Sequence, residues 1–120
     1  MTVSYFVRYE VEAPEEFIRH YRDKHVPILA RWPGMRRILL HTDLKVKDPF
    51  QVNPGKTLLV AQLEFESQGD LERALESPQR AEARRDFQEF PPCEGKVFHQ
   101  AMRQEEVYRS PWLDANEEEA

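Results

Sequence analysis

The sequence predicts an α+β domain in which four antiparallel strands form one sheet and helices cover a single face of it. Three observations carry this prediction. Apolar and polar residues alternate along four segments, as they do in half-buried strands. Helical periodicity fills the interval after the first segment and the interval after the third. The resulting order, β-α-β-β-α-β, is that of the ferredoxin-like fold, whose right-handed crossovers place both helices on the same side.

The four strands are predicted at residues 3–11, 35–46, 57–66 and 95–108. In the first and third, alternate residues are predicted to face the core: Val3, Tyr5, Val7 and Tyr9, then Leu59, Ala61, Leu63 and Phe65. Residues 45–56 form a connection longer than a hairpin needs, with Asp48-Pro49 and Asn53-Pro54-Gly55 as turn signals.

The second face of this sheet has no predicted helix to cover it. It nevertheless carries the apolar side chains of Leu39, Leu58, Val60, Phe98 and Met102. An apolar surface of this kind marks an interaction site, and the simplest partner is a second copy of the chain. We therefore expect a homodimer that forms through the exposed sheet face.

The first helix is predicted to begin at Pro14, whose fixed φ suits the first helical position. One arc of this helix carries Phe17, Tyr21, His25, Ile28, Leu29 and Trp32. Pro27 has no N–H for the carbonyl of Asp23, so we expect a kink or break at 25–27. The second helical region spans 67–90, with Ser67 and Ser77 as N-caps and Pro91-Pro92 at its end.

Length and charge narrow the classes of function. A chain of 120 residues predicts one domain, at 1–108, followed by an acidic C-terminal tail at 109–120. The net charge is −5 and the body of the chain is nearly neutral, so neither nucleic acid nor a membrane is an expected partner. Cys93 is the single cysteine, which excludes an intrachain disulfide. With no apolar run long enough to span a bilayer, we expect a cytoplasmic protein.

The first helix also carries a motif. Phe17, Tyr21, His25 and Pro27 follow the spacing F-x3-Y-x3-H-x-P, and Trp32-Pro33-Gly34-Met35-Arg36-Arg37 comes next. In this pattern the chain resembles the EthD-type family of the dimeric α+β barrel superfamily, and the strand order extends the resemblance over residues 3–107. The resemblance implies a homodimer whose sheets pack face to face, and a pocket between each sheet and its helices. Superfamily relatives include muconolactone isomerases, polyketide cyclases, dye-decolourising peroxidases and haem-degrading oxygenases.

His25 and Tyr21 are the candidate catalytic residues. Burial lowers the pKa of an imidazole in an apolar pocket, so His25 can act as a general base near neutral pH. The alternative is a structural histidine that bonds a carbonyl freed by Pro27. Tyr21 either donates a hydrogen bond to a substrate or is simply a core aromatic residue. The candidate substrate-binding residues are Phe17, Trp32, His41 and Phe87. Two alternatives stay open for His41: it meets His25 across the gap between sheet and helix, or it faces solvent or a partner. His99 has the same alternatives.

No G-x-G-x-x-G, P-loop or G-x-S-x-G motif is present, and we predict no cofactor. His20 and His25 lie about 140° apart on an α-helix and are not expected to bind one metal ion. Arg80, Arg84 and Arg85 are interpreted as solvated or paired surface charge. Three functions remain open. The protein is a cofactor-independent isomerase, lyase or cyclase of a small apolar or aromatic carbonyl compound or lactone, a non-catalytic accessory or ligand-binding protein, or a haem-binding protein.

Overall fold

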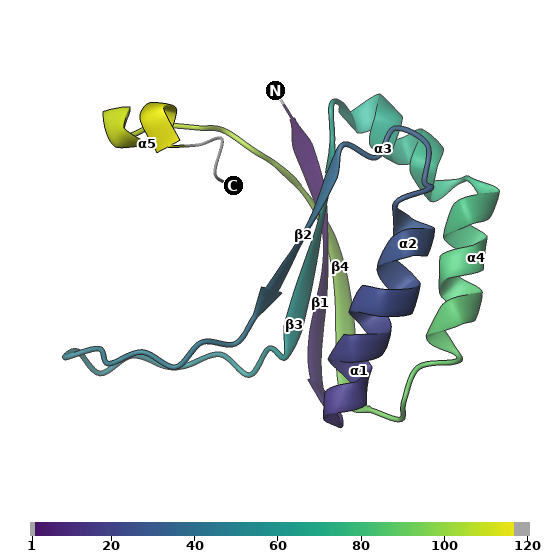
Figure 1. Cartoon of the computed structure of the whole chain (residues 1–120), viewed down its shortest axis with the longest axis horizontal. Helices are drawn as coiled ribbons and strands as arrows, with labels where there is room; N and C mark the ends of the chain where they lie inside the picture. Colours follow the sequence, from purple (N-terminus) through teal and green to yellow (C-terminus); the bar gives the residue numbers. More distant parts are fainter. Residues whose placement is uncertain (1, 117–120) are drawn as a thin grey trace.

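The computed structural model describes residues 2–116 and confirms the predicted fold class (Figure 1). Four strands form one antiparallel sheet in the order β2-β3-β1-β4. Their bounds are β1 (Val3–Glu12), β2 (Arg37–Thr42), β3 (Leu59–Phe65) and β4 (Glu94–Arg103). Figure 1 shows the sheet nearly edge-on, with α1, α2, α3 and α4 all on one side of it.

The second and fourth strands are shorter than the sequence predicts. The alternation of apolar residues continues past Thr42 and past Arg103, but the chain leaves the sheet at both points. Residues 43–57 form an extended arm, in which Leu44 and Val46 are 78% and 73% exposed. Alternation reports which side chains favour burial, and a strand forms only where a neighbouring strand accepts its hydrogen bonds.

Of the kink or break predicted at 25–27, the break does not occur: the first helical region is continuous, and its irregularity lies just before Pro27. It consists of α1 (Glu15–His20), the π-helical turn η1 (Tyr21–His25) and α2 (Val26–Leu29). Pro14 is the N-cap and not the first helical residue. The last N–H before the proline, that of Val26, bonds the carbonyl of Tyr21 five residues back. The missing donor at Pro27 is thus accommodated by a wider turn upstream of it, a common place for a π-bulge.

The second helical region contains α3 (Gln68–Leu75) and α4 (Pro78–Phe87). Both predicted caps form: Ser67 Oγ accepts the Asp70 N–H at 3.2 Å, and Ser77 Oγ accepts the Arg80 N–H at 3.3 Å. A short helix, α5 (Pro111–Asn116), forms where the sequence predicts an irregular tail. The remaining tail residues, 117–120, lie outside the described residues.

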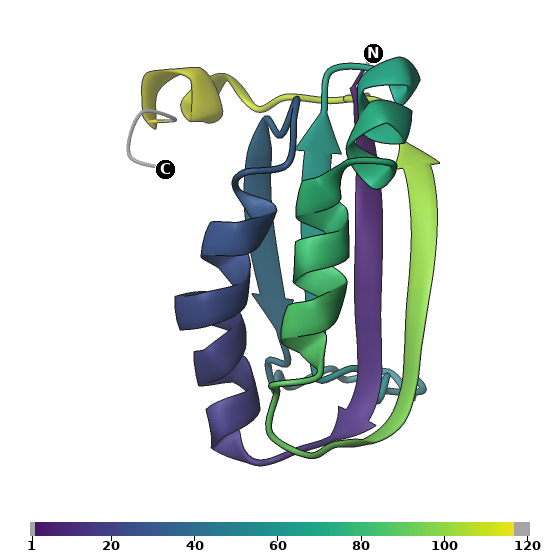
Figure 2. The same ribbon diagram turned by 90° about the vertical axis from the view of Figure 1, so that its right-hand side faces the viewer.

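The core lies between the sheet and the helices. Phe17, Leu59, Leu63 and Phe65 are fully buried there, as their positions in the sequence pattern predict. Viewed from the helix side, the edge strand β4 has no helix in front of it (Figure 2). This side of the helix layer is therefore open.

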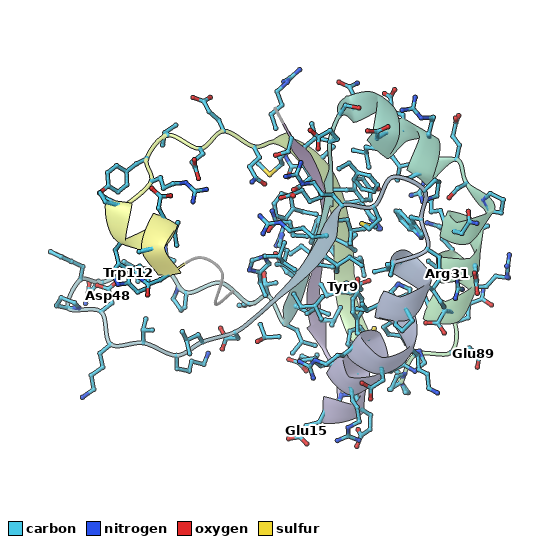
Figure 3. The ribbon with its side chains drawn as sticks, turned by 45° about the horizontal axis from the view of Figure 1, so that its top comes forward. Tyr9, Glu15, Arg31, Asp48, Glu89 and Trp112 are labelled. Atoms are coloured by element: carbon cyan, nitrogen blue, oxygen red, sulfur yellow. The ribbon has the colours of Figure 1, made fainter. Side chains whose placement is uncertain are left out.

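The face of the sheet opposite the helices is bare in the described chain. The strand register puts Leu39, Val60, Phe98 and Met102 on this face, as predicted, together with Phe6. Leu58 instead packs against the core just before β3. The arm and α5 project on this same side of the sheet, as the positions of Asp48 and Trp112 in Figure 3 also show. Within residues 2–116, no helix has the length and apolar character that crossing a bilayer requires.

Gly95 is the residue of β4 at which the fold leaves no room for a side chain. Its φ is +138°, and a Cβ there would lie 2.1 Å from the carbonyl oxygen of Glu10. We expect Gly95→Ala to lower the free energy of unfolding by more than about 2 kcal/mol, because strain and overlap add. Urea denaturation measures the change. Gly55→Ala in the arm, with nothing within 4 Å, is the control; equal stability of the two variants would contradict the expectation.

Candidate functional site

A cavity of about 200 Å³ lies between the sheet and the helices. The strands supply its floor: Tyr5, Val7, Tyr9, Leu63, Val97 and His99. The helices and the turn after α2 supply its walls: Tyr21, His25, Leu29, Trp32, Arg80, Ala83, Arg84 and Phe87. Most of these side chains are apolar or aromatic, which is typical of a site for a small organic molecule.

His25 is fixed in this cavity by a carboxylate from the other helix. Its Nδ1 lies 2.9 Å from Asp86 Oδ2 on α4, 61 residues away in the sequence. An ionised carboxylate only accepts hydrogen bonds, so the neutral imidazole carries its proton on Nδ1 and leaves a lone pair on Nε2. In the part of the chain that the structure describes, Nε2 has no hydrogen-bond partner. His25 therefore has the tautomer that a general base requires.

The environment of His25 lowers its pKa below the ordinary value of 6.5. Burial is the main cause, because His25 is only 5% exposed and the charged form loses its hydration. Asp86 opposes this shift by its hydrogen bond and its charge, and nearby His20 adds to the lowering. His25 is therefore neutral at neutral pH.

Two tyrosines, Tyr21 and Tyr9, lie one after the other beside His25. The Tyr21 and His25 rings are 4.8 Å apart, and the Tyr9 and Tyr21 rings are 5.6 Å apart. Burial raises the pKa of Tyr9 to about 12 and raises that of Tyr21 well above its usual value. Both phenols stay protonated at neutral pH. The two phenols interact with each other, and both retain a proton for donation. In Figure 3, Tyr9 lies between the sheet and the helix layer.

The structure brings together four of the six residues singled out from the sequence. His25, Tyr21, Trp32 and Phe87 all line the cavity. Phe17 does not, because it is fully buried in the core against Tyr9 and Phe90. His41 lies on the opposite face of the sheet, where its Nε2 is 3.0 Å from Gln62 Oε1. His41 therefore does not meet His25, and the alternative that it faces away from the helices is the correct one.

Sequence reasoning missed several polar residues of the cavity and its support. Asp86, Tyr9 and His99 were not proposed as site residues, and Arg80 and Arg84 were interpreted as surface charge. A signal for the arginines was present, since Arg80, Ala83, Arg84 and Phe87 recur at helical spacing on one face of α4. No local signal marks Asp86, because its role depends on how two helices pack.

His20 and His25 also come closer than an α-helix would allow. His20 Nε2 lies 3.2 Å from Asp86 Oδ2, the same oxygen that His25 contacts. The π turn between them places one more residue in each turn, so the predicted angle of 140° does not hold. Within residues 2–116, no group of three or more His, Cys, Asp or Glu side chains is arranged to hold a metal ion.

The indole N–H of Trp32 is buried without a hydrogen-bond partner among the described residues. Trp32 is only 5% exposed and lines the cavity wall. An unpaired buried donor costs about 1–3 kcal/mol, and such groups are rare outside functional sites. The nitrogen itself is enclosed by protein, so the fold leaves this donor without an acceptor among the described residues.

A ferredoxin-like sheet with an aromatic-lined cavity under its helices defines a class of small α+β proteins. The sequence places this chain within that class: residues 11–90 match the EthD domain, and the chain belongs to the EthD family. His25, Tyr21, Asp86 and both cavity arginines lie inside the matched range, whereas His99 lies outside it.

One curated relative and several solved structures are similar to this chain. The chain is 32% identical over 77 residues to an uncharacterised 11.0 kDa protein of the thcB–thcC intergenic region of Rhodococcus erythropolis, which covers 64% of this chain and 71% of that protein. An EthD family protein of Bacillus halodurans superposes with a TM-score of 0.67 at 20% identity, over 88% of this chain and 100% of the other.

Two further solved structures share the fold. SnoaB of Streptomyces nogalater, a cofactor-independent oxygenase, has a TM-score of 0.57 at 18% identity and covers 91% of this chain and 98% of its own. A dimeric protein with a ferredoxin-like fold from Bacteroides fragilis has a TM-score of 0.55 at 13% identity, over 86% of this chain and 96% of the other. At these identities the likeness concerns the fold alone.

The pKa of His25 is directly testable by NMR titration of its imidazole. We expect a value below 6.5 in the wild type and a lower value in Asp86→Asn, because the variant removes the charge that favours the imidazolium. The unfolded chain then takes up the proton first, so His25 costs stability as the pH falls from 6.5 towards its folded-state pKa. Glu82→Gln is the control: Glu82 lies on α4 like Asp86, but its partner is Arg31 and not His25. A wild-type value above 6.5 would contradict this account.

Proposed function

We propose that this protein binds a small apolar or aromatic carbonyl compound or lactone and that His25 transfers a proton between carbon and oxygen within it. One observation carries the proposal: the imidazole that lines the cavity is held through Nδ1 by Asp86 at 2.9 Å. A positioned, neutral imidazole with a free Nε2 is a group suited to general base catalysis. Isomerisation, dehydration and cyclisation of carbonyl compounds all begin with the step that such a base performs.

The proposed step conserves atoms and charge. Nε2 of His25 removes a proton from the carbon next to the carbonyl group. The electron pair of the broken C–H bond forms the enolate, and its negative charge develops on the carbonyl oxygen. The imidazolium, with its positive charge stabilised by Asp86, then returns the proton to another carbon or to the oxygen.

A donor for the developing oxyanion is available beside the base. Tyr9 and Tyr21 both line the cavity, and both keep the hydroxyl proton that can bond the enolate oxygen of the guest. The raised pKa values of both phenols favour hydrogen-bond donation over ionisation. Stabilisation of charge at the point where it develops is usually the largest contribution to such catalysis.

The volume of the cavity limits the size of the guest. A protein cavity of about 150 Å³ accommodates benzene, so about 200 Å³ accommodates one substituted ring or a small lactone. A macrocycle of four pyrrole rings is much larger. The volume therefore favours a small organic guest over haem.

Exchange of carbon-bound protons with D2O, followed by proton NMR, tests this chemistry without knowledge of the product. We expect a one-ring ketone or lactone from a panel to exchange at its acidic carbon in the presence of the wild type. Since general acid–base catalysis contributes about 10²–10⁴-fold, His25→Gln should lower the exchange rate by at least about 100-fold. His41→Gln, on the opposite face of the sheet, should leave the rate unchanged.

The same panel separates catalysis from binding alone. If the wild type binds panel members but exchanges none of their protons, the accessory or ligand-binding function replaces the enzymatic one. If His25→Gln retains full exchange, another group is the base and the proposed role of His25 is wrong.

We further propose that the protein is a homodimer formed through the open face of the sheet. Phe98 and Met102 on this face are 39% and 49% exposed, and the arm adds Phe50 at 76%. Apolar surface of this extent is stabilised by burial against a partner. The face is opposite the helices, so a second copy would leave the cavity open.

Sedimentation at micromolar concentration tests the assembly. We expect twice the chain mass of 14.3 kDa for the wild type. Val60→Arg, which places a second positive charge beside Arg8 on the open face, should give the monomer because two adjacent like charges are costly to bury. Ala81→Asp, on the exposed side of α4, should remain dimeric. A monodisperse wild-type monomer would exclude this interface.

A further inference from the structure

The cavity has a charge that differs from that of the whole chain. The chain carries 22 acidic and 17 basic side chains, for a net charge of −5. Its cavity is nevertheless lined by two arginines, Arg80 and Arg84, and by no carboxylate. In an acidic protein, two arginines on a cavity wall without a compensating carboxylate attract an anion from solution.

These arginines lie at the mouth of the cavity. Its inner walls, at Leu63, Tyr21, Leu29 and His25, are almost fully buried. Arg84, Phe87 and His99 are the exposed residues of the lining, and Arg80 is half-buried. The mouth therefore lies between α4 and the edge strand β4, the side that no helix covers in Figure 2.

The guanidinium groups have unused hydrogen-bond donors. Arg80 Nη1 donates to the carbonyl of Leu75 at 3.3 Å, and its other N–H groups have no partner in the described chain. Arg84 forms neither an ion pair nor a hydrogen bond with any described residue. Arg31 of the same region, by contrast, is already paired with Glu82 at 2.6 Å. The planar forks of Arg80 and Arg84 are suited to a carboxylate, which accepts two N–H groups at once.

His99 lies next to both arginines. Partial burial, and after it the charges of the two arginines, lowers the pKa of His99 below 6.5, so it is neutral at neutral pH and can still donate one hydrogen bond. The Tyr5 and His99 rings are 5.8 Å apart at the floor of the mouth. The mouth thus presents two permanent positive charges and a neutral imidazole.

We propose that the ligand of this cavity is an organic acid of about one ring, whose carboxylate binds Arg80 and Arg84 at the mouth while its apolar body extends inward to His25. This assignment rests on the proposed function and names its substrate class. The carboxylate stays in partial contact with water, and the reacting carbon lies in the dry interior. Arg80 and Arg84 are positioning and specificity residues in this arrangement, and they take no part in the proton transfer.

Binding of matched ligands tests the assignment without turnover. Isothermal titration calorimetry compares benzoate and phenylacetate with the neutral isosteres benzamide and phenylacetamide. We expect at least one acid to bind about tenfold or more tightly than its amide. Arg80→Gln combined with Arg84→Gln should remove this preference and leave amide binding unchanged. Arg84→Gln alone, which breaks no hydrogen bond of the fold, should reduce the preference.

Arg85→Gln is the matched control, because Arg85 is an exposed arginine of the same helix outside the cavity lining and its loss changes the net charge equally. Its preference should equal that of the wild type. The assignment is overturned if acids and amides bind equally, if neither binds at millimolar concentration, if Arg85→Gln loses the preference as well, or if inorganic phosphate binds as tightly as the acids.

The two proposals fail independently. His25→Gln should retain the preference for the acid, since the imidazole is not part of the anion site. If the wild type exchanges carbon-bound protons but does not prefer the acid over its amide, the substrate is not an organic acid. The proposed role of His25 as the base would then be unaffected. A retained preference without proton exchange in the wild type would leave an acid-binding protein that is not an enzyme.

Discussion

The hydrogen bond between His25 and Asp86 is the constraint on which the site depends. It joins the π turn to α4 across 61 residues of sequence, and it gives a buried imidazole the partner that burial demands. A buried polar group without a partner costs about 1–3 kcal/mol, whereas a hydrogen bond to a charged group contributes about 1.5–3 kcal/mol. The contact therefore permits the histidine to be buried and at the same time selects its tautomer. The position, the burial and the protonation state of His25 thus all depend on its hydrogen bond with Asp86.

The parts of the fold that sequence reasoning predicts are those governed by local rules. The alternation from Val3 to Tyr9 predicts a strand with one buried face. This prediction does not depend on which neighbouring strand it pairs with. Ser67 and Ser77 cap helices because each hydroxyl reaches an amide three residues ahead. His25, Tyr21 and Trp32 follow from helical periodicity in the same way. In each case the information lies within a few residues of the feature.

The errors have a common physical origin in long-range packing. Asp86 becomes part of the site only when α4 packs beside η1, and His20 approaches the same carboxylate only because the turn between the histidines is π-helical. The strand that ends at Thr42 was extended too far for a related reason. Leu44 and Val46 have the pattern of buried residues, yet the described chain contains nothing to bury them. A pattern that demands burial without finding it within one chain is what an interface with a second copy would produce.

The charge at the mouth contributes to the neutrality of one of the two cavity histidines. Burial disfavours a proton on both His25 and His99, and Arg80 and Arg84 add to this effect at His99, so the cavity contains two neutral imidazoles beside two cations. A bound carboxylate would neutralise part of that positive charge and raise the proton affinity of His99. An anionic substrate in this cavity would therefore compensate the arginines at the entrance and leave the neutral, buried His25 as the base of the interior.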